Sequence, residues 1–253
     1  RPDRRSAGWG GGNRGSDFSG RDGFSRYHGR DVAGVPSHPH RGFETVTLAR
    51  RGYIDHSDSL GAKARFGMGD VQWMTAGKGV VHSEMFPMLD PDEPNPVELF
   101  QIWLNLPARD KMVDPYFTMF WSHQIPGLEE QGVKVTAICG SPDPQLICPD
   151  PPPDSWASRP EAEIAIWTIE LRPGAKWTLP AASKGLNRAL YTVDSGGVTI
   201  AGTACGAKER IRVQSDAAIE LVNGEQRTEL LLLQGRPIGE PVAQHGPFVM
   251  NSR

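Results

Sequence analysis

The sequence has 253 residues, of which 38% are hydrophobic and 23% are charged, and its formal net charge is −3. These values are typical of a globular protein long enough for a well-buried core, and the absence of a Lys/Arg block disfavours direct binding to nucleic acid. No apolar run approaches the roughly 20 residues of a membrane-spanning helix, so we expect neither a membrane segment nor a signal peptide.

The chain begins with a segment of unusual composition. Residues 1–27 are rich in glycine, serine and arginine and show almost no apolar period, which predicts a flexible or loosely packed arm. The three cysteines, Cys139, Cys148 and Cys205, do not have the spacing of a metal site. We interpret them as free thiols in a reducing compartment and therefore expect a cytoplasmic location.

Beyond the arm, short runs of β-branched and aromatic residues alternate with turn signals at intervals of about eight to twelve residues. No window carries an apolar helical stripe longer than about two turns. This rhythm predicts an all-β sandwich or barrel, with residues 111–130 as a connecting segment. The expected strands cover residues 43–48, 52–56, 64–66, 71–76, 80–86, 98–106, 133–140, 165–171, 176–180, 189–196, 198–202, 218–224 and 229–235.

The strand rhythm is interrupted by a proline-rich stretch after residue 140, which excludes regular structure there and offers an interdomain loop. The strand series on the two sides of it have the same architecture. We therefore expect an N-terminal barrel over residues 28–132. A C-terminal barrel with a tail is expected over residues 133–253.

The sharpest chemical signal is a pair of short motifs, His38-Pro39-His40 and His82-Ser83-Glu84. Alternate residues of a β-strand point to the same face, so each motif aims two side chains at one point. Two such strands facing each other across a small barrel would supply three imidazoles and one carboxylate to a single divalent transition metal. The alternative is that all four are surface polar residues of alternating strands.

Several other residues are candidates for the surroundings of this site. His56 could be a rival ligand, but a hydrogen-bonding or turn role fits better because metal-bound histidines need partners for their other ring nitrogen. Gln101 is a polar residue on an apolar strand, with either a pocket-lining or a structural role. The aromatic residues could line a pocket, although barrel core is the alternative for each; they are Phe43, Trp73, Phe100 and Trp103. His28, His123 and His245 are expected to be structural or exposed.

Four segments of the chain, from about residue 28 onward, resemble the signature segments of the pirin family in the cupin superfamily. They are HPHRGFETVT, GDVQWMTAGKGVVHSEM, ELFQIWLNLP and QHGPFVMN. The resemblance implies a bicupin, that is, two cupin (jelly-roll) β-barrels in tandem, with one metal ion in the N-terminal barrel and none in the C-terminal barrel. Carried over position by position, it implies the metal ligands His38, His40, His82 and Glu84. The glutamate of other cupins falls on Glu44, which this resemblance places beside the ligands rather than on the metal.

The resemblance also implies a chemistry. The family metal is usually iron, which implies Fe(II), although such ligands also accept Mn, Ni, Cu or Zn. Several members have quercetin 2,3-dioxygenase activity, so we expect oxygenation of a flavonol-type or related enolic small molecule by O₂. Glu84 would be the general base.

Two other functions stay open. A eukaryotic branch of the family acts as a nuclear transcriptional cofactor, so the alternative is a non-catalytic, iron-binding redox sensor that acts through a protein partner, nuclear in a eukaryote. A third possibility is a metal kept only for folding. The resemblance favours a monomer.

Overall fold

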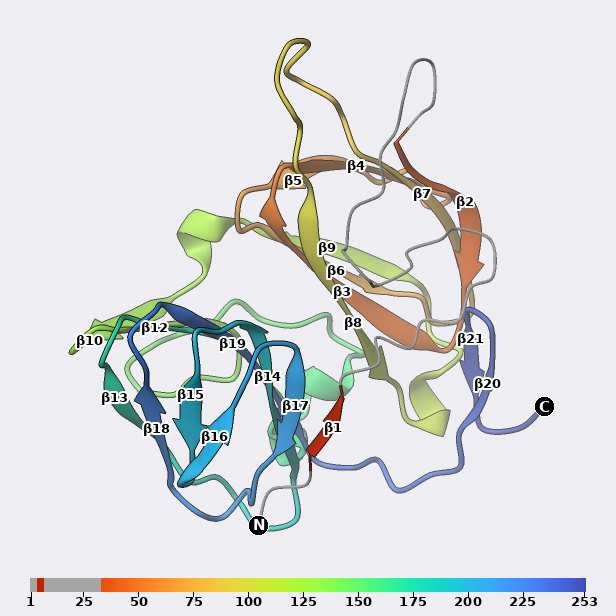
Figure 1. Ribbon diagram of the computed structural model, residues 1–253. Coiled ribbons are helices and arrows are strands. Elements are labelled where there is room, and N and C mark those ends of the chain that lie inside the picture. Colours follow the sequence, from red (N-terminus) through yellow and green to blue (C-terminus); the bar gives the residue numbers. More distant parts are fainter. Residues whose placement is uncertain (1–3, 7–32) are drawn as a thin grey trace. The chain divides into compact units, whose positions relative to one another are not determined.

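The computed structural model describes residues 4–6 and 33–253 (Figure 1). These residues divide into two compact units. We call one the N-terminal unit (residues 33–122, 152–156 and 239–253) and the other the C-terminal unit (residues 4–6, 123–151 and 157–238). Both are built of antiparallel sheets, which confirms the expected all-β fold. Single-turn 3-10 helices lie between strands, at Ala108–Asp110, Ser122–Gln124, Trp156–Ser158 and Pro160–Ala162. No helix in the described ranges is long and apolar enough to cross a membrane.

Eight strands form the two main sheets of the N-terminal unit. Their bounds are Gly34–His40 for β2, Phe43–Arg51 for β3, Tyr53–Asp58 for β4, Lys63–Gly67 for β5, Val71–Thr75 for β6, Val80–Met85 for β7, Glu98–Asn105 for β8 and Tyr116–Phe120 for β9. The order β2-β7-β4-β5 makes one sheet, here called the histidine sheet, and the order β8-β3-β6-β9 makes the other, the opposing sheet. Figure 1 shows the two sheets facing each other. Ala49 of β3, Ile54 of β4 and Phe66 of β5 pack together between them.

The local sequence explains how each sheet is buried. The run FETVTLA of β3 is buried on both faces, as expected for a central strand rich in β-branched residues. On β7, burial alternates: Val80, His82 and Glu84 are buried, whereas Val81 and Met85 are exposed. This period of two turns His82 and Glu84 toward the interior of the unit.

The C-terminal unit contains eleven of the described strands. Their bounds are Arg4–Ser6 for β1, Gly127–Glu130 for β10, Val133–Cys139 for β11, Ala165–Leu171 for β12, Lys176–Leu179 for β13, Asn187–Asp194 for β14, Val198–Ile200 for β15, Thr203–Cys205 for β16, Glu209–Arg212 for β17, Ile219–Asn223 for β18 and Thr228–Gly235 for β19. They make a seven-stranded sheet, β1-β17-β14-β19-β12-β11-β10, and a four-stranded sheet, β13-β18-β15-β16. Apolar side chains such as Trp167, Ile169 and Leu190 fill the core.

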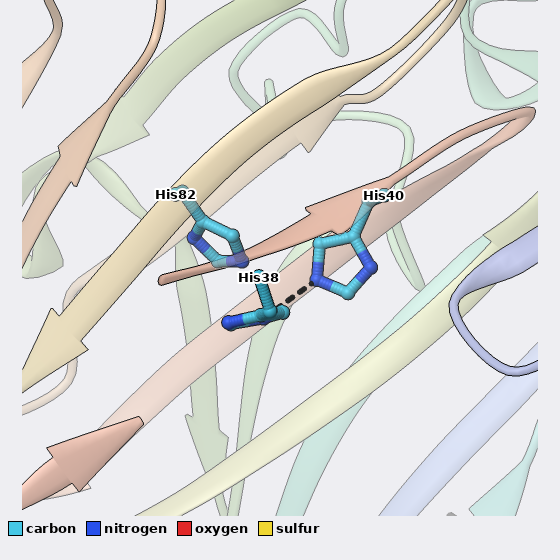
Figure 2. A group of neighbouring side chains, drawn as sticks. All are labelled: His38, His40 and His82. Atoms are coloured by element: carbon cyan, nitrogen blue, oxygen red, sulfur yellow. Dashed lines mark hydrogen bonds between the residues drawn. The ribbon is translucent and has the colours of Figure 1, made fainter. Parts of the chain in front are cut away.

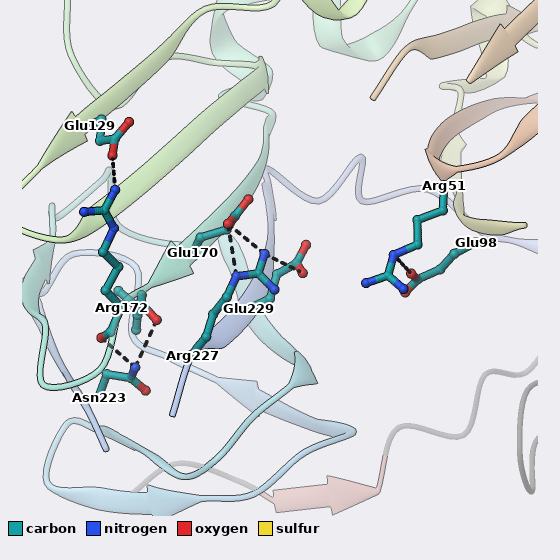
Figure 3. Close-up of polar contacts among 9 residues, drawn as sticks. Arg51, Glu98, Glu129, Glu170, Arg172, Asn223, Arg227 and Glu229 are labelled. Carbon is teal, nitrogen blue, oxygen red and sulfur yellow. Dashed lines mark hydrogen bonds and ion pairs between the residues drawn. The ribbon is translucent and has the colours of Figure 1, made fainter. Parts of the chain in front are cut away.

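Polar contacts link residues in or next to different strands of this unit (Figure 3). Arg172 pairs with Glu129 at 2.8 Å and Arg227 pairs with Glu170 at 2.7 Å. The buried Asn223 amide donates to the backbone carbonyls of Leu171, Arg172 and Gln226 at 2.8–3.0 Å. The ion pairs are exposed and contribute little, whereas the amide satisfies three carbonyl groups at once.

The end of the chain packs in the N-terminal unit. Strands β20 (Ala243–His245) and β21 (Phe248–Met250) form a hairpin, and Phe248 makes a β-bridge with Arg41. The buried Lys111 ammonium donates to the carbonyls of Gly42 and Val249, each at 2.8 Å, and to the Asn105 side chain at 2.7 Å. This cation therefore ties the tail to the residues that follow His40.

Three details differ from the expectations. The connecting segment predicted at 111–130 contains β9 and β10. The C-terminal unit begins near residue 123 rather than 133 because β10 pairs with β11, and the tail from residue 239 belongs to the N-terminal unit. The predicted arm lies largely outside the described residues; within it, Arg4–Ser6 pairs with β17.

Candidate metal centre

Three adjacent strands of the histidine sheet carry the polar cluster. In the antiparallel registers, His38 of β2 lies opposite His82 of β7, and His56 of β4 lies opposite Glu84 of β7. Directly opposed residues have Cβ atoms only about 4.5–5.5 Å apart, so these side chains meet on one face. The prediction that the two motif strands face each other across a barrel is wrong: β2 and β7 are hydrogen-bonded neighbours, and the cluster forms between them.

The imidazoles of His38, His40 and His82 point toward one another (Figure 2). The Nε2 atoms of His38 and His40 are 3.0 Å apart, and the ring centroids of His38 and His82 are 4.3 Å apart. One ligand nitrogen from each ring lies within 4.8 Å of the others. His40 and His82 are buried, and His38 is partly exposed.

Glu84 joins a second group, with His56 and His82, whose ligand atoms also lie within 4.8 Å of one another. The four residues of the predicted ligand set thus fall into two overlapping groups that share His82. Glu84 and His56 are each 3% exposed.

Burial sets the charge states of this cluster. Burial, together with the neighbouring His38, lowers the pKa of His40 to about 3 and that of His82 to about 2. Burial also lowers the pKa of His56, against the effect of Asp58, and raises the pKa of Glu84 to about 7. Near neutral pH the buried imidazoles are therefore uncharged and keep a lone pair for a metal, while Glu84 is close to its titration midpoint.

The donor atoms fit a divalent cation. His38 Nδ1 donates to the Pro36 carbonyl at 2.8 Å, which leaves the lone pair on Nε2. Two nitrogens bound at right angles to one ion, each about 2.1 Å from it, would be about 3.0 Å apart, as the Nε2 atoms of His38 and His40 are. In the described part of the chain, His82 Nε2 and Glu84 Oε1 are buried without a hydrogen-bond partner. Such atoms cost about 1–3 kcal/mol each, a cost that coordination removes.

Aromatic side chains of the opposing sheet border the imidazoles. The His56 ring stacks on Phe117 at 4.8 Å, and the His40 ring lies 5.2 Å from Phe43 and 5.9 Å from Trp103. Phe43 is buried and contacts His40, and its role in a pocket stays a prediction. Gln101 accepts a hydrogen bond from the Trp103 indole at 3.2 Å and so holds that ring in place.

Glu44 and Trp73 lie apart from the imidazoles. Both belong to the face of the opposing sheet that turns away from the histidines, because Glu44 follows Phe43 and strand faces alternate. The Glu44 carboxylate accepts hydrogen bonds from Trp73 at 3.2 Å, Thr75 at 2.7 Å and Ser155 at 2.6 Å. Burial raises the pKa of Glu44 to about 7, although these bonds lower it. The predicted roles of Glu44 beside the ligands and of Trp73 in the pocket have no support in these contacts.

The remaining candidate residues are Phe100 and three histidines. Phe100 is buried under the Arg50 guanidinium, on the strand face opposite Gln101. His123 and His245 are exposed, as expected, and His28 lies outside the described residues. The contacts of Asp58, Gln72 and Phe117 with His56 were not predicted. Asp58 could have been found, because it follows His56 by two residues and shares its strand face.

Two family models match the chain. Residues 4–104 match the model described as Pirin, and residues 166–253 match the model described as Pirin C-terminal cupin domain. A protein of Pseudomonas aeruginosa with the provisional name quercetin 2,3-dioxygenase PA3240 is 37% identical over 229 residues, which cover 88% of this chain and 75% of that protein. Human pirin is 35% identical over 241 residues, which cover 90% of this chain and 76% of that protein.

The fold comparison agrees with the sequence comparison. A crystal structure of quercetin 2,3-dioxygenase from Acinetobacter baumannii matches with a TM-score of 0.76 at 32% identity, covering 88% of this chain and 75% of that one. These matches confirm the resemblance and the two-cupin architecture inferred from it. The chain belongs to the pirin family.

Proposed function

We propose that this protein is a metal-dependent oxygenase of the quercetin 2,3-dioxygenase type, acting on a flavonol or a related enolic compound with O₂. The observation that carries the proposal is the convergence of His38, His40 and His82 beside a buried carboxyl group, Glu84, on one sheet face. The names of the relatives from P. aeruginosa and A. baumannii support it.

In this proposal the ion is held by the four residues His38, His40, His82 and Glu84. Fe(II) is the first choice, and Mn, Ni, Cu or Zn would suit the same nitrogen and oxygen donors. When bound, the ion supplies Lewis acidity that acidifies an enolic hydroxyl and a place where substrate and O₂ meet.

In this proposal, the Glu84 side chain takes up the proton of the substrate hydroxyl. The substrate O–H bond breaks and an O–H bond forms on a Glu84 carboxylate oxygen, because the carboxylate is the one group of the proposed set that can both bind the ion and take up a proton. Its Oε1 atom has no other hydrogen-bond donor among the described residues. Glu84 thus takes up the proton inside a buried site, where water competes little.

The aromatic border selects the shape of the substrate. Phe43, Trp103 and Phe117 present ring surfaces around the imidazoles, which favours a flat aromatic molecule. Trp103 is 40% exposed and His38 is partly exposed, so we place the entrance on their side.

The test is to prepare metal-free protein, reload it separately with Fe(II), Mn(II), Ni(II), Cu(II) and Zn(II), and follow O₂ uptake together with loss of flavonol absorbance. We expect turnover with at least one metal and loss of turnover in His40→Ala and His82→Ala. His123→Ala, at an exposed histidine, is the matched control and keeps full activity. If the ion binds but no flavonol is consumed with any metal, oxygenation of flavonols is ruled out and the redox-sensing alternative is favoured.

A further inference from the structure

Three side chains of the histidine sheet form a hydrogen-bonded chain. Asp58 Oδ2 lies 3.0 Å from His56 Nε2, and His56 Nδ1 lies 3.3 Å from His82 Nδ1. The side chains of Asp58 and His56 have no solvent exposure, so water does not take the place of either contact. The chain ends at the ring that both groups of candidate ligands share.

The partners of His56 determine which of its nitrogens carries the proton. A carboxylate only accepts, so His56 Nε2 must donate to Asp58. The Gln72 amide nitrogen, which only donates, lies 3.2 Å from His56 Nδ1. Two independent neighbours therefore require that Nδ1 of His56 be an acceptor.

The tautomer of His56 also bears on the tautomer of His82. Because His56 Nδ1 accepts, its contact with His82 Nδ1 is a hydrogen bond only when His82 Nδ1 carries the proton. A neutral imidazole with its proton on Nδ1 has its lone pair on Nε2. That Nε2 atom is buried and has no hydrogen-bond partner in the described part of the chain.

We propose that Asp58 and His56 are positioning residues that fix His82 in the one tautomer able to bind a metal through Nε2. This inference rests on the proposed metal site and deepens it. His38 is oriented by a backbone carbonyl, that of Pro36, whereas His82 depends on a chain of side chains that ends in a charge. A substitution at Asp58 or His56 can therefore change the tautomer of His82 without changing that of His38.

Asp58→Asn is the decisive substitution because the surrounding backbone fixes how the new amide lies. Asp58 Oδ1 accepts from the amides of Leu60 at 2.9 Å and Ala62 at 3.0 Å. In the variant the amide oxygen stays with these donors, so the amide nitrogen faces His56 Nε2. Two donors cannot face each other, so the proton of His56 moves to Nδ1 and opposes the Nδ1 proton of His82.

The first test measures affinity for Zn(II) and Fe(II) by competition with a chromophoric chelator. We expect Asp58→Asn to bind about 10- to 100-fold more weakly than the wild type, the usual effect of losing an outer hydrogen bond to a metal-bound histidine. Asp55→Asn is the matched control: Asp55 lies on the same strand but pairs with Arg65 on the other face, and its substitution leaves affinity unchanged. Equal affinities in Asp58→Asn and wild type would overturn the proposal.

The second test needs no variant and no metal. Long-range ¹H–¹⁵N spectra of the metal-free wild type distinguish protonated from unprotonated ring nitrogens. We expect His82 to be protonated at Nδ1 only and His56 at Nε2 only. A His82 ring protonated at Nε2 contradicts the proposal, even if flavonol turnover is found. Conversely, the expected tautomers together with absent turnover would refute the oxygenase and leave this inference standing.

Discussion

His38 on β2 lies directly opposite His82 on β7, with ring centroids 4.3 Å apart. The pairing of two sequence-distant strands thus creates the candidate metal centre, and each strand contributes two inward-facing groups. The cluster consequently depends on strand register, because a shift of one residue would turn these side chains to the other face.

Removal of the metal should lower the unfolding free energy of the wild type, because the candidate site lies within the N-terminal unit. A ligand that binds only the folded state stabilises it by about 2.7 kcal/mol at 100 times its dissociation constant. We therefore expect added Zn(II) to raise the Tm of chelator-treated wild type and not that of His82→Ala. Differential scanning calorimetry measures both, with His123→Ala as the control that still responds. An equal response in His82→Ala would place the binding site elsewhere.

Metal affinity should depend on pH through Glu84. Its pKa of about 7 means that binding below pH 7 must release its proton, whereas His40 and His82, with pKa values of about 3 and 2, hold none to release. Affinity should rise about tenfold per pH unit from pH 5 to 7 and then level off. Calorimetric titrations at several pH values would show this slope. In Glu84→Gln we expect weaker binding and a shallower slope; an unchanged slope in that variant assigns the proton to another group.

Glu44 should make stability fall as the pH rises. Its pKa is about 7 in the folded chain against an ordinary value of 4.5, so between these values the folded state holds a proton that the unfolded state has lost. The stabilisation is complete below pH 4.5 and is lost as the pH rises to 7, at about 1.4 kcal/mol per unit.

Glu44→Gln isolates this effect, because the amide oxygen can still accept from Trp73 and Thr75. Urea unfolding of metal-free protein would give the difference in unfolding free energy between wild type and variant. We expect this difference to decline by about 3 kcal/mol between pH 4.5 and 7. A difference that does not change with pH would show that Glu44 is ionised throughout.

Lys111 should be essential for holding the tail. Lys111→Met removes the donor shared by Gly42, Asn105 and Val249, leaving buried oxygens unpaired, so we expect a loss of roughly 2–4 kcal/mol in unfolding free energy. The control, Lys78→Met, removes an exposed lysine paired with Asp114 and should cost less than about 1 kcal/mol. Equal losses would mean that the tail contacts contribute little.

Local patterns predicted much of the fold because most strands are β-branched runs separated by turn residues. β9 escaped prediction because its five residues, YFTMF, do not alternate between apolar and polar side chains. The pairing of β2 with β7 joins strands that are distant in sequence, so no local pattern contains it. The sequence motifs brought His38, His40 and His82 together, as the structure does, but placed them on facing strands.

The surroundings of the centre were harder to predict. The sequence around Asp58 favours a turn, and the Leu60 amide of that turn does donate to Asp58 Oδ1. The other carboxylate oxygen, Oδ2, contacts His56 at the same time. Glu44 was misplaced by analogy with other cupins, although its position next to Phe43 already puts the two on opposite strand faces.

Anomalous X-ray diffraction from crystals of protein loaded with one transition metal tests the proposed metal site most directly. We expect one strong peak within bonding distance of the imidazoles of His38, His40 and His82 and of the Glu84 carboxylate. A peak held by other residues, or a loaded crystal with no peak at this cluster, would contradict it.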